Sequence, residues 1–425
     1  MISIYNYGEK TEDEIFARTE SKANVAEIVA EIIADVAKRG DEAVKYYCKK
    51  FDGAVLDSLL VTDEEIQEAV AEVDEKFLSI LKTAAKNIRA FHEKQVRKGF
   101  EIQKEDGIVI GQKITAVDTA GLYVPGGTAA YPSTVLMDAI PAKIAGVGSL
   151  VMVTPPGSDG KVNPVILASA HVAGVDKIFK VGGAQAIAAL AYGTQTIPKA
   201  DKIVGPGNAF VAEAKRQVYG MVSIDMIAGP SEILVVADTS ANPRHLAADL
   251  LSQAEHDKMA SAVLVCNSME LANKVSDELE RQIPLLERAE IARTSIDTNG
   301  KIIVAPDLSK AIEISNKIAP EHLELCVEKP FDYLDKVKHA GSVFMGHYCP
   351  EALGDYYAGP NHTLPTSGTA RFSSPLSVDD FIKKTQYTYY TETALKKVKD
   401  DVAYFATKEG LTAHAKSALV RFEEE

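Results

Sequence analysis

The chain has 425 residues, of which 46% are apolar and 25% are charged, a composition typical of a soluble globular protein. This length is too great for one compact core, so two or more globular units are expected. Acidic residues outnumber basic residues by 60 to 46, giving a net charge of −14. With no stripe of Lys and Arg to offset that charge, nucleic acid is excluded as an expected partner.

Cysteine usage and the N-terminus bound the cellular compartment. The four cysteines, Cys48, Cys266, Cys326 and Cys349, lie far apart without a Cys-x-x-Cys pair, which argues against a disulfide framework and a thiolate zinc site. The N-terminus lacks a basic segment followed by an apolar one, and no run of about twenty apolar residues occurs. We therefore expect a cytoplasmic protein without membrane contact.

Residues 11–100 have helical periodicity. In residues 23–37 the apolar residues fall on one helical face, and Gly40 predicts the end of that helix. Thr62, followed by three acidic residues, predicts an N-cap, and a long helix is expected over residues 77–95.

From about residue 113, short apolar runs alternate with helical segments. A first series of strands is expected at 121–124, 150–154, 177–180 and 202–204. A second series is expected at 233–237, 262–266, 301–304, 323–327 and 342–345. Such alternation predicts parallel sheets covered on both faces. The expected fold is therefore α/β, with two adjacent incomplete Rossmann-like parallel-sheet units, N-terminal helices and a mostly helical C-terminal tail.

Four regions follow from this pattern. An N-terminal helical region, 1–112, is expected to pack with the second α/β unit. The first α/β domain is expected at 113–232, and the second, at 233–375, carries the candidate metal and acid/base residues. The tail spans 376–425. The segment 354–374 is rich in Gly, Pro, Ser, Thr and Asn, and long loops of this kind are usually functional.

A candidate metal site combines an amide, two imidazoles and a carboxylate. Gln253 and His256 lie three residues apart at the end of an expected helix, so their side chains can share one side. Alone, this pair is more typical of a solvated helix end, and Gln is an unusual zinc ligand. Asp355 and His414 bring the set to four, the number that zinc prefers. Nitrogen and oxygen donors of this kind suit zinc, manganese or cobalt equally.

The adjacent pair Glu321 and His322 is a candidate acid/base pair. It immediately precedes an expected strand, and neighbouring residues in an extended chain point to opposite sides. Both can therefore serve one site only if the backbone turns there. His322 would then act as a general base and Glu321 would activate water. The alternative is a helix-to-strand connector with two solvated polar residues.

Three glycine turns, at 126–127, 182–183 and 205–207, follow expected strands. Ligands bind at the carboxyl ends of strands in open parallel sheets, where glycine lets a phosphate approach backbone N–H groups. Simple strand-to-helix connectors are the alternative. The sequence contains no G-x-G-x-x-G, Walker A lysine, G-x-S-x-G elbow or H-E-x-x-H helix, which removes the commonest dinucleotide-fingerprint, NTPase, esterase and metalloprotease interpretations.

Taken together, the motifs resemble those of the histidinol dehydrogenase family from the N-terminal helices to His414. The segments that carry the resemblance, in order, are Leu-Tyr-Val-Pro-Gly-Gly (122–127), Val-Gly-Gly-Ala-Gln-Ala-Ile-Ala (181–188), Gly-Pro-Gly-Asn (205–208), Ala-Gly-Pro-Ser-Glu (228–232), Asp-Leu-Leu-Ser-Gln-Ala-Glu-His (249–256), Ala-Pro-Glu-His-Leu (319–323), Gly-Asp-Tyr (354–356), Gly-Pro-Asn-His-Thr-Leu-Pro-Thr (359–366) and Glu-Gly-Leu-Thr-Ala-His (409–414).

The resemblance implies a zinc-dependent enzyme that oxidises L-histidinol to L-histidine with two NAD⁺, the last steps of histidine biosynthesis. It implies one zinc per subunit on Gln253, His256, Asp355 and His414, which also border the substrate. Substrate contacts are implied for Ser231, His322, His362 and Glu409, and NAD contacts in the first α/β domain for Tyr123, Gln185 and Asn208. It also implies a homodimer whose C-terminal tail crosses to the neighbouring subunit, so that Glu409 and His414 act there.

Three alternatives remain open. A relative of this family could oxidise another hydroxylated substrate, although the imidazole-contacting positions His362 and Glu409 are present. A zinc hydrolase on an α/β scaffold would lack NAD binding. A binding protein of periplasmic type would carry a signal peptide and no bound metal.

Overall fold

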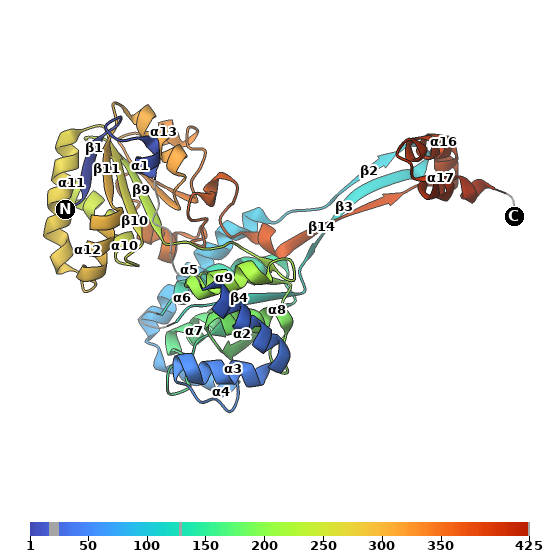
Figure 1. Cartoon of the computed structure of the whole chain (residues 1–425), viewed down its shortest axis with the longest axis horizontal. Helices are drawn as coiled ribbons and strands as arrows, with labels where there is room; N and C mark the ends of the chain where they lie inside the picture. The colour runs from blue at the N-terminus through green and yellow to red at the C-terminus, as the bar shows by residue number, and fades with distance from the viewer. Residues whose placement is uncertain (17–24, 127–129, 424–425) are drawn as a thin grey trace. The chain divides into compact units, whose positions relative to one another are not determined.

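The computed structural model describes residues 1–16, 25–126 and 130–423, which form two compact units (Figure 1). The larger unit comprises residues 1–95 and 117–381, and the smaller unit comprises residues 96–116 and 382–425. Two parallel sheets lie in the larger unit, and helices pack against them, so the predicted α/β fold is confirmed. Within the described ranges, no helix has both the length and the apolar character needed to cross a membrane.

One sheet of the larger unit has six strands in the order β1-β11-β10-β9-β12-β13, and every neighbouring pair is parallel. Its strands are β1 (Ser3–Asn6), β9 (Glu232–Ala237), β10 (Ser261–Cys266), β11 (Lys301–Val304), β12 (His322–Cys326) and β13 (Ser342–Met345). All six residues of β9 are buried, as expected for a strand that is covered on both faces. The predicted buried strand residues Cys266 and Cys326 are buried in this sheet.

Helices cover both faces of the six-stranded sheet. One face packs against α10 (Pro243–Ala254), α11 (Met269–Gln282) and α12 (Ala289–Asn299), and the other packs against α1 (Glu12–Phe16), α13 (Leu308–Ile318) and α14 (Phe331–Leu334). Successive side chains of a strand alternate between faces. Ile233 packs on the α10 face, and His322 lies beside it in the parallel register. The side chain of His322 therefore lies on the α10 face.

The other sheet of the larger unit has five strands in the order β6-β5-β4-β7-β8, again all parallel. Its strands are β4 (Thr119–Tyr123), β5 (Ser149–Thr154), β6 (Lys177–Lys180), β7 (Lys202–Val204) and β8 (Ser223–Ile224). The helices between them are α6 (Pro132–Ala145), α7 (Pro164–Ala173), α8 (Gly183–Tyr192) and α9 (Ala209–Val218). Each of the four strands predicted for this region is present.

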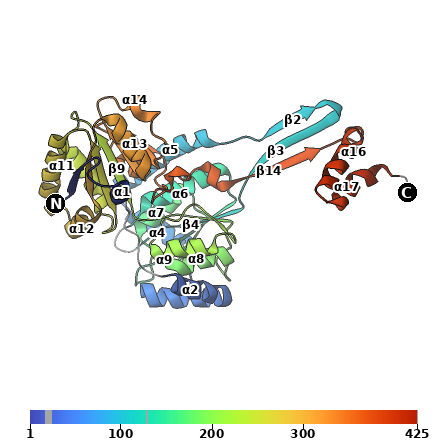
Figure 2. The same cartoon turned by 45° about the horizontal axis from the view of Figure 1, so that its top comes forward.

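The N-terminal helices pack on the five-stranded sheet, whereas the sequence analysis placed them with the second α/β unit. These helices are α2 (Ala26–Arg39), α3 (Asp41–Tyr47), α4 (Asp63–Glu72) and α5 (Glu75–His92). Val29, Ile32 and Val36 share one core with Val151 and Phe179, and α2 lies on the outer side of α8 and α9 (Figure 2). Only β1, with α1, joins the six-stranded sheet. The amphipathic face of α2 is complementary to either sheet by composition, so its partner was not encoded in its periodicity.

The predicted local signals at the helix ends are present. Thr62 and Glu65 form a capping box, in which the Thr62 hydroxyl accepts the Glu65 N–H at 3.2 Å and the Glu65 carboxylate accepts the Thr62 N–H at 2.9 Å. Gly40 ends α2 with a φ of 59°. These local signals were readable because each depends on residues three or four apart.

The smaller unit is a three-stranded antiparallel sheet followed by two helices. The sheet order is β14-β3-β2, with β2 (Phe100–Lys104), β3 (Ile108–Ala116) and β14 (Ile382–Tyr389), and the helices are α16 (Glu392–Lys408) and α17 (Thr412–Leu419). The expectation of a tail without strands is wrong at β14. This strand has the sequence Ile-Lys-Lys-Thr-Gln-Tyr-Thr-Tyr and seven of its residues are exposed, so it lacks the apolar alternation of a half-buried strand.

Candidate active site

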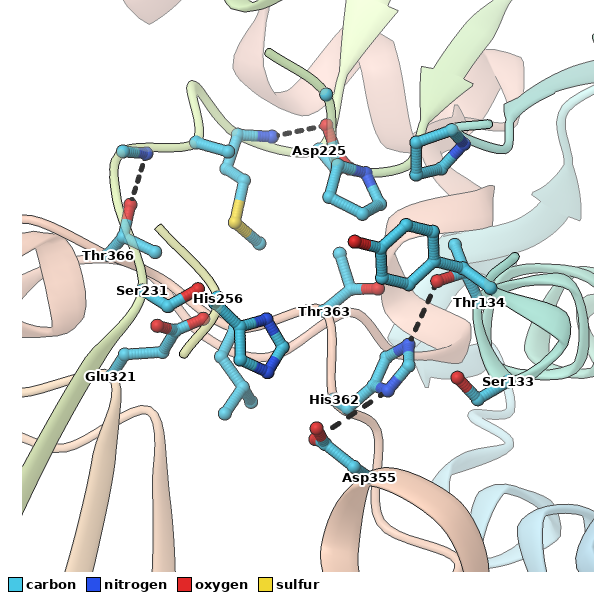
Figure 3. Close-up of a pocket in the computed structure, with 18 of the residues that line it drawn as sticks. Ser133, Thr134, Asp225, Ser231, His256, Glu321, Asp355, His362, Thr363 and Thr366 are labelled. Atoms are coloured by element: carbon cyan, nitrogen blue, oxygen red, sulfur yellow. Dashed lines mark hydrogen bonds and ion pairs between the residues drawn. The ribbon is translucent and has the colours of Figure 1, made fainter. Parts of the chain in front are cut away.

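A cavity of about 370 Å³ lies in the larger unit between its two sheets (Figure 3). One wall comes from the carboxyl ends of β4, β7 and β8, and includes Tyr123 and Asn208. The facing wall comes from the amino ends of β9 and β12, and includes Ser231, Glu321 and His322. Ligand sites of open parallel sheets usually lie at carboxyl ends alone, so the second wall departs from that rule.

The first wall holds two of the three predicted NAD-contacting residues. Tyr123 ends β4, and its hydroxyl oxygen accepts the N–H of Gly183 at 3.1 Å. The side chain of Asn208 accepts the N–H groups of Phe210 and Val211, so Asn208 is the N-cap of α9. Gln185 is buried in α8 and does not line the cavity.

The predicted glycine turns contribute to the same wall. Gly126 and Gly207 line the cavity, whereas Gly182 and Gly183 do not. The second glycine of the first turn, at position 127, lies outside the described residues.

His322 is the first residue of β12, and its two ring nitrogens have different environments. Nδ1 lies 3.0 Å from the carbonyl oxygen of Glu232, to which it donates. Nε2 is buried and has no hydrogen-bond partner among the described residues. Burial lowers the pKa of His322, which favours a neutral ring. Because Nδ1 carries the proton, Nε2 presents a lone pair, as a general base requires.

Glu321 faces the same cavity as His322 because the chain turns ahead of β12. Ala319, at the end of α13, has a left-handed φ of 52°, and Pro320 follows it. The Glu321 carboxylate accepts the N–H of Glu232 at 2.8 Å and lies 3.6 Å from Nδ1 of His322. Burial raises the pKa of Glu321 well above its usual value, so its ionised form is a stronger base than an exposed carboxylate.

Three of the four predicted metal ligands line the cavity. Gln253 lies in the last turn of α10, and its buried Oε1 accepts no hydrogen bond from a described residue. His256 lies two residues beyond α10 and is exposed. Asp355 lies in the π-helical turn Gly354–Ala358, with Oδ1 4.0 Å from Nε2 of His322. Burial raises the pKa of Asp355 to about 9.

The fourth predicted ligand, His414, and the predicted substrate contact Glu409 belong to the smaller unit. His414 lies in α17, and Glu409 is the C-cap of α16. Both side chains are exposed, and neither residue lines the cavity.

His362 reaches the cavity from the loop after the π-helical turn (Figure 3). Its Nε2 lies 3.4 Å from the hydroxyl of Thr134, and its Nδ1 lies 3.7 Å from Oδ1 of Asp355. Burial lowers the pKa of His362 to about 4, so this ring is neutral at physiological pH. A neutral imidazole between two polar partners can pair with another imidazole.

The residues on either side of His362 are anchored to α6. The side-chain amide of Asn361 donates to the carbonyl oxygen of Met137 at 2.7 Å, and the hydroxyl of Thr363 donates to Oδ1 of Asp138 at 3.1 Å. All of these polar groups are buried. Buried hydrogen bonds of this kind fix a loop that contains little regular structure.

The sequence analysis missed Glu351, which the structure places beside His322. Its Oε1 is buried without a described hydrogen-bond partner, 3.8 Å from Nε2 of His322, and its Oε2 accepts the hydroxyl of Ser252 at 2.9 Å. Burial acts to raise the pKa of Glu351, but His322, Asp355 and Ser252 together hold it below its usual value. Asp355 retains the proton, and Glu351 carries the negative charge. Its position four residues before Asp355 was the only available signal.

The donor atoms around the cavity suit a divalent cation. Ligand atoms of His322, Glu351 and Asp355 lie within 4.8 Å of one another. The unpartnered Oε1 of Gln253 adds an amide oxygen. Nitrogen and oxygen donors without cysteine fit zinc and other first-row cations.

Known proteins of one family match this chain over nearly its full length. The model of the histidinol dehydrogenase family matches residues 16–422. The histidinol dehydrogenase of Clostridium acetobutylicum is 58% identical over 401 residues, covering 94% of this chain and 93% of its own. That of Bacillus cereus is 58% identical over 397 residues, covering 93% and 92%.

The crystal structure of histidinol dehydrogenase from Elizabethkingia anophelis is similar in fold. It superposes with a TM-score of 0.94 at 39% identity, covering 99% of this chain and 98% of its own. The family match, the two relatives and this structure agree with the motifs that line the cavity. The chain therefore belongs to the histidinol dehydrogenase family, and it is a dehydrogenase.

Proposed function

We propose that this enzyme oxidises L-histidinol to L-histidine through bound histidinal, using two NAD⁺ and one zinc ion per subunit. The observation that best supports this proposal is the cavity that faces Glu321 and His322 across from Tyr123 and Asn208. An acid/base pair on one wall and a glycine turn on the other suit a dehydrogenase that must hold substrate and dinucleotide together. L-histidine is an amino acid made for the cell's own use, and a cytoplasmic location remains our expectation.

Zinc would be held by Gln253, His256 and Asp355, with His414 as the fourth ligand. The unpartnered buried Oε1 of Gln253 fits this assignment, since an orphaned acceptor is rare in protein interiors. When bound, zinc orients the imidazole and amino nitrogens of the substrate, and NAD⁺ accepts the hydride. Tyr123, Gln185 and Asn208 would contact NAD.

His322 would take the proton of the substrate hydroxyl at Nε2. Its Nδ1–H stays on the carbonyl oxygen of Glu232, which fixes the ring and its tautomer. The ring becomes positive when it accepts the proton, and the carboxylate of Glu351, 3.8 Å from Nε2, would stabilise that charge. Ser231, His362 and Glu409 would bind the substrate around this centre.

Glu321 would act in the second oxidation. One of its oxygens accepts the N–H of Glu232, which leaves the other to take a proton from water. The hydroxide equivalent would add to the aldehyde to give a hydrate, and His322 would again act as the base while the hydrate is oxidised. An enclosed cavity retains the reactive aldehyde between the two steps.

We further propose a homodimer in which Glu409 and His414 of the partner subunit complete each cavity. Both residues are exposed on the smaller unit, in agreement with a role at a surface that another chain covers. That unit also exposes large apolar side chains, which are common at interfaces. They include Phe100, Ile102, Tyr389, Tyr404 and Phe405.

Two experiments test these proposals. His256→Asn should lose bound zinc and activity together, because it removes a nitrogen ligand; full activity in the metal-free variant would reject the zinc assignment. For the dimer, mixing inactive His322→Asn and His414→Asn chains should restore activity in the heterodimers, since one of the two cavities would be intact. No recovery in verified heterodimers would show that each site is built within one chain.

A further inference from the structure

A buried ion pair lies directly beneath the first wall of the cavity. Lys215 in α9 and Asp225 after β8 are paired, and their side chains are only 2% and 0% exposed. Burying two charges is unfavourable unless both are paired and hydrogen-bonded. Burial also raises the pKa of neighbouring Asp138 well above its usual value, so Asp138 is neutral and the pair carries one charge of each sign.

Both members of this pair bind the backbone of one residue, Gly205. The Nζ of Lys215 donates to the carbonyl oxygen of Gly205 at 2.9 Å. Oδ2 of Asp225 accepts the N–H of Gly205 at 2.7 Å, and Oδ1 accepts the N–H of Met226 at 2.6 Å. The two polar backbone groups of Gly205 therefore both end on the ion pair, which fixes the orientation of the peptide planes on either side of this residue.

Gly205 is the point at which the chain leaves β7 and enters the cavity wall. Its φ is +115°, a conformation that glycine adopts readily and other residues rarely. A Cβ here would lie 2.1 Å from the carbonyl oxygen of Tyr123, so no other residue fits. A glycine in such a turn is free to change conformation unless other groups hold it.

The residues that follow Gly205 line the cavity. Pro206, Gly207 and Asn208 form its wall, and Asn208 then caps α9. The ion pair thus connects α9, on which Lys215 lies, to the turn that begins that helix. A rigid turn lowers the conformational entropy that a ligand loses on binding, and so strengthens binding.

We propose that Lys215 and Asp225 are positioning residues that hold the turn of residues 205–208 in the shape that binds the dinucleotide. This inference rests on the proposed function, in which NAD contacts Asn208 and Tyr123. It assigns to the pair an effect on NAD⁺ binding and none on zinc or L-histidinol, whose proposed ligands lie mainly on the facing wall.

The test uses the full-length enzyme and the double substitution Lys215→Met/Asp225→Asn. Removing both charges avoids an unpaired buried charge, and the side-chain amide introduced at position 225 still offers an oxygen to the Gly205 N–H, so only the contact to the Gly205 carbonyl is lost. The matched control is Lys202→Met/Asp380→Asn, which removes an ion pair at the opposite end of β7, where the side chains are 8% and 27% exposed.

Isothermal titration calorimetry with NAD⁺ and with L-histidinol, zinc content and steady-state kinetics would be measured for all three proteins. We expect the Lys215/Asp225 variant to raise the Kd and KM for NAD⁺ about tenfold, the equivalent of one lost charge-assisted hydrogen bond. Its kcat at saturating NAD⁺, zinc content and affinity for L-histidinol should stay within about twofold of the parent. The control should match the parent throughout.

The inference is overturned if the folded variant binds NAD⁺ as tightly as the parent, or if the control loses NAD⁺ affinity equally. It is also overturned if kcat and zinc content fall as far as NAD⁺ affinity, since that pattern indicates a general structural role. Should the double variant fail to fold, Asp225→Asn alone, which keeps the contact from Lys215 to Gly205, replaces it with the same readouts and a smaller expected shift. If the parent enzyme itself does not bind NAD⁺, the proposed function fails instead.

Discussion

Substituting Glu351 by Gln tests whether a buried carboxylate stabilises the protonated base. The change keeps the size of the side chain and a polar partner for Ser252, but it removes the negative charge 3.8 Å from Nε2 of His322. At this distance and an effective dielectric constant of about 20, two unit charges attract by about 4.4 kcal/mol. At about 1.4 kcal/mol per tenfold change in rate, that energy corresponds to a loss of about a thousandfold at most.

We therefore expect kcat for NADH formation from L-histidinol to fall about a hundredfold to a thousandfold in Glu351→Gln at saturating substrates. Ser252→Ala is the matched control, because it removes a hydrogen bond from Glu351 and leaves its charge; its kcat should fall less than about tenfold. Zinc content and L-histidinol affinity should be unchanged in both variants. A Glu351→Gln enzyme within threefold of the parent would refute the reasoning, and loss of zinc from it would make Glu351 a metal ligand instead.

Three further predictions concern the second oxidation, the substrate loop and stability. Glu321→Gln should slow oxidation of histidinal more than oxidation of L-histidinol, because only the aldehyde step needs an activated water; equal slowing of the two half-reactions would reject this role. Thr363→Val leaves the buried carboxyl of Asp138 without its hydroxyl donor, so we expect unfolding free energy in urea to drop by about 1–3 kcal/mol and KM for L-histidinol to rise more than KM for NAD⁺; an unchanged KM ratio would contradict the anchoring of His362. Burial raises the pKa of Asp52 from 3.8 to about 6, so its contribution to stability is full below pH 3.8 and is lost as the pH rises through 6. The full shift corresponds to about 3 kcal/mol, and solvent exposure of the carboxyl reduces the expected loss to about 1 kcal/mol. Asp52→Asn should accordingly raise the melting temperature at pH 8 and not at pH 4, and an equal effect at both values would exclude this cause.

The sequence predicted the buried strands because their composition reports their surroundings. Strand β9 is apolar at five successive positions, a pattern typical of a strand with helices on both faces. Strand β14 carries Lys, Thr, Gln and Tyr in a mainly exposed sheet, and nothing in its own residues distinguishes it from a polar helix or loop. Its pairing with β3 joins segments more than 260 residues apart, which no local pattern records.

The site was predicted in part for the same reason. Gln253, His256, Glu321, His322, Asp355 and His362 occur in compact motifs, and the structure brings all six to one cavity. Glu351 has no motif partner of its own, and its importance follows from a distance to His322 that only the fold sets. The packing of α2 on the five-stranded sheet was likewise undetermined, since its apolar face fits any apolar surface.

The measurement that tests the central claim most directly is the number of NADH formed per L-histidinol consumed, before and after chelation. Two NADH per substrate, abolished by a chelator and restored by zinc, is the result expected if the cavity carries out both oxidations with its metal in place. One NADH per substrate with release of the aldehyde would contradict the role of Glu321 and His322 in a second oxidation, and full activity after verified removal of metal would contradict the zinc site.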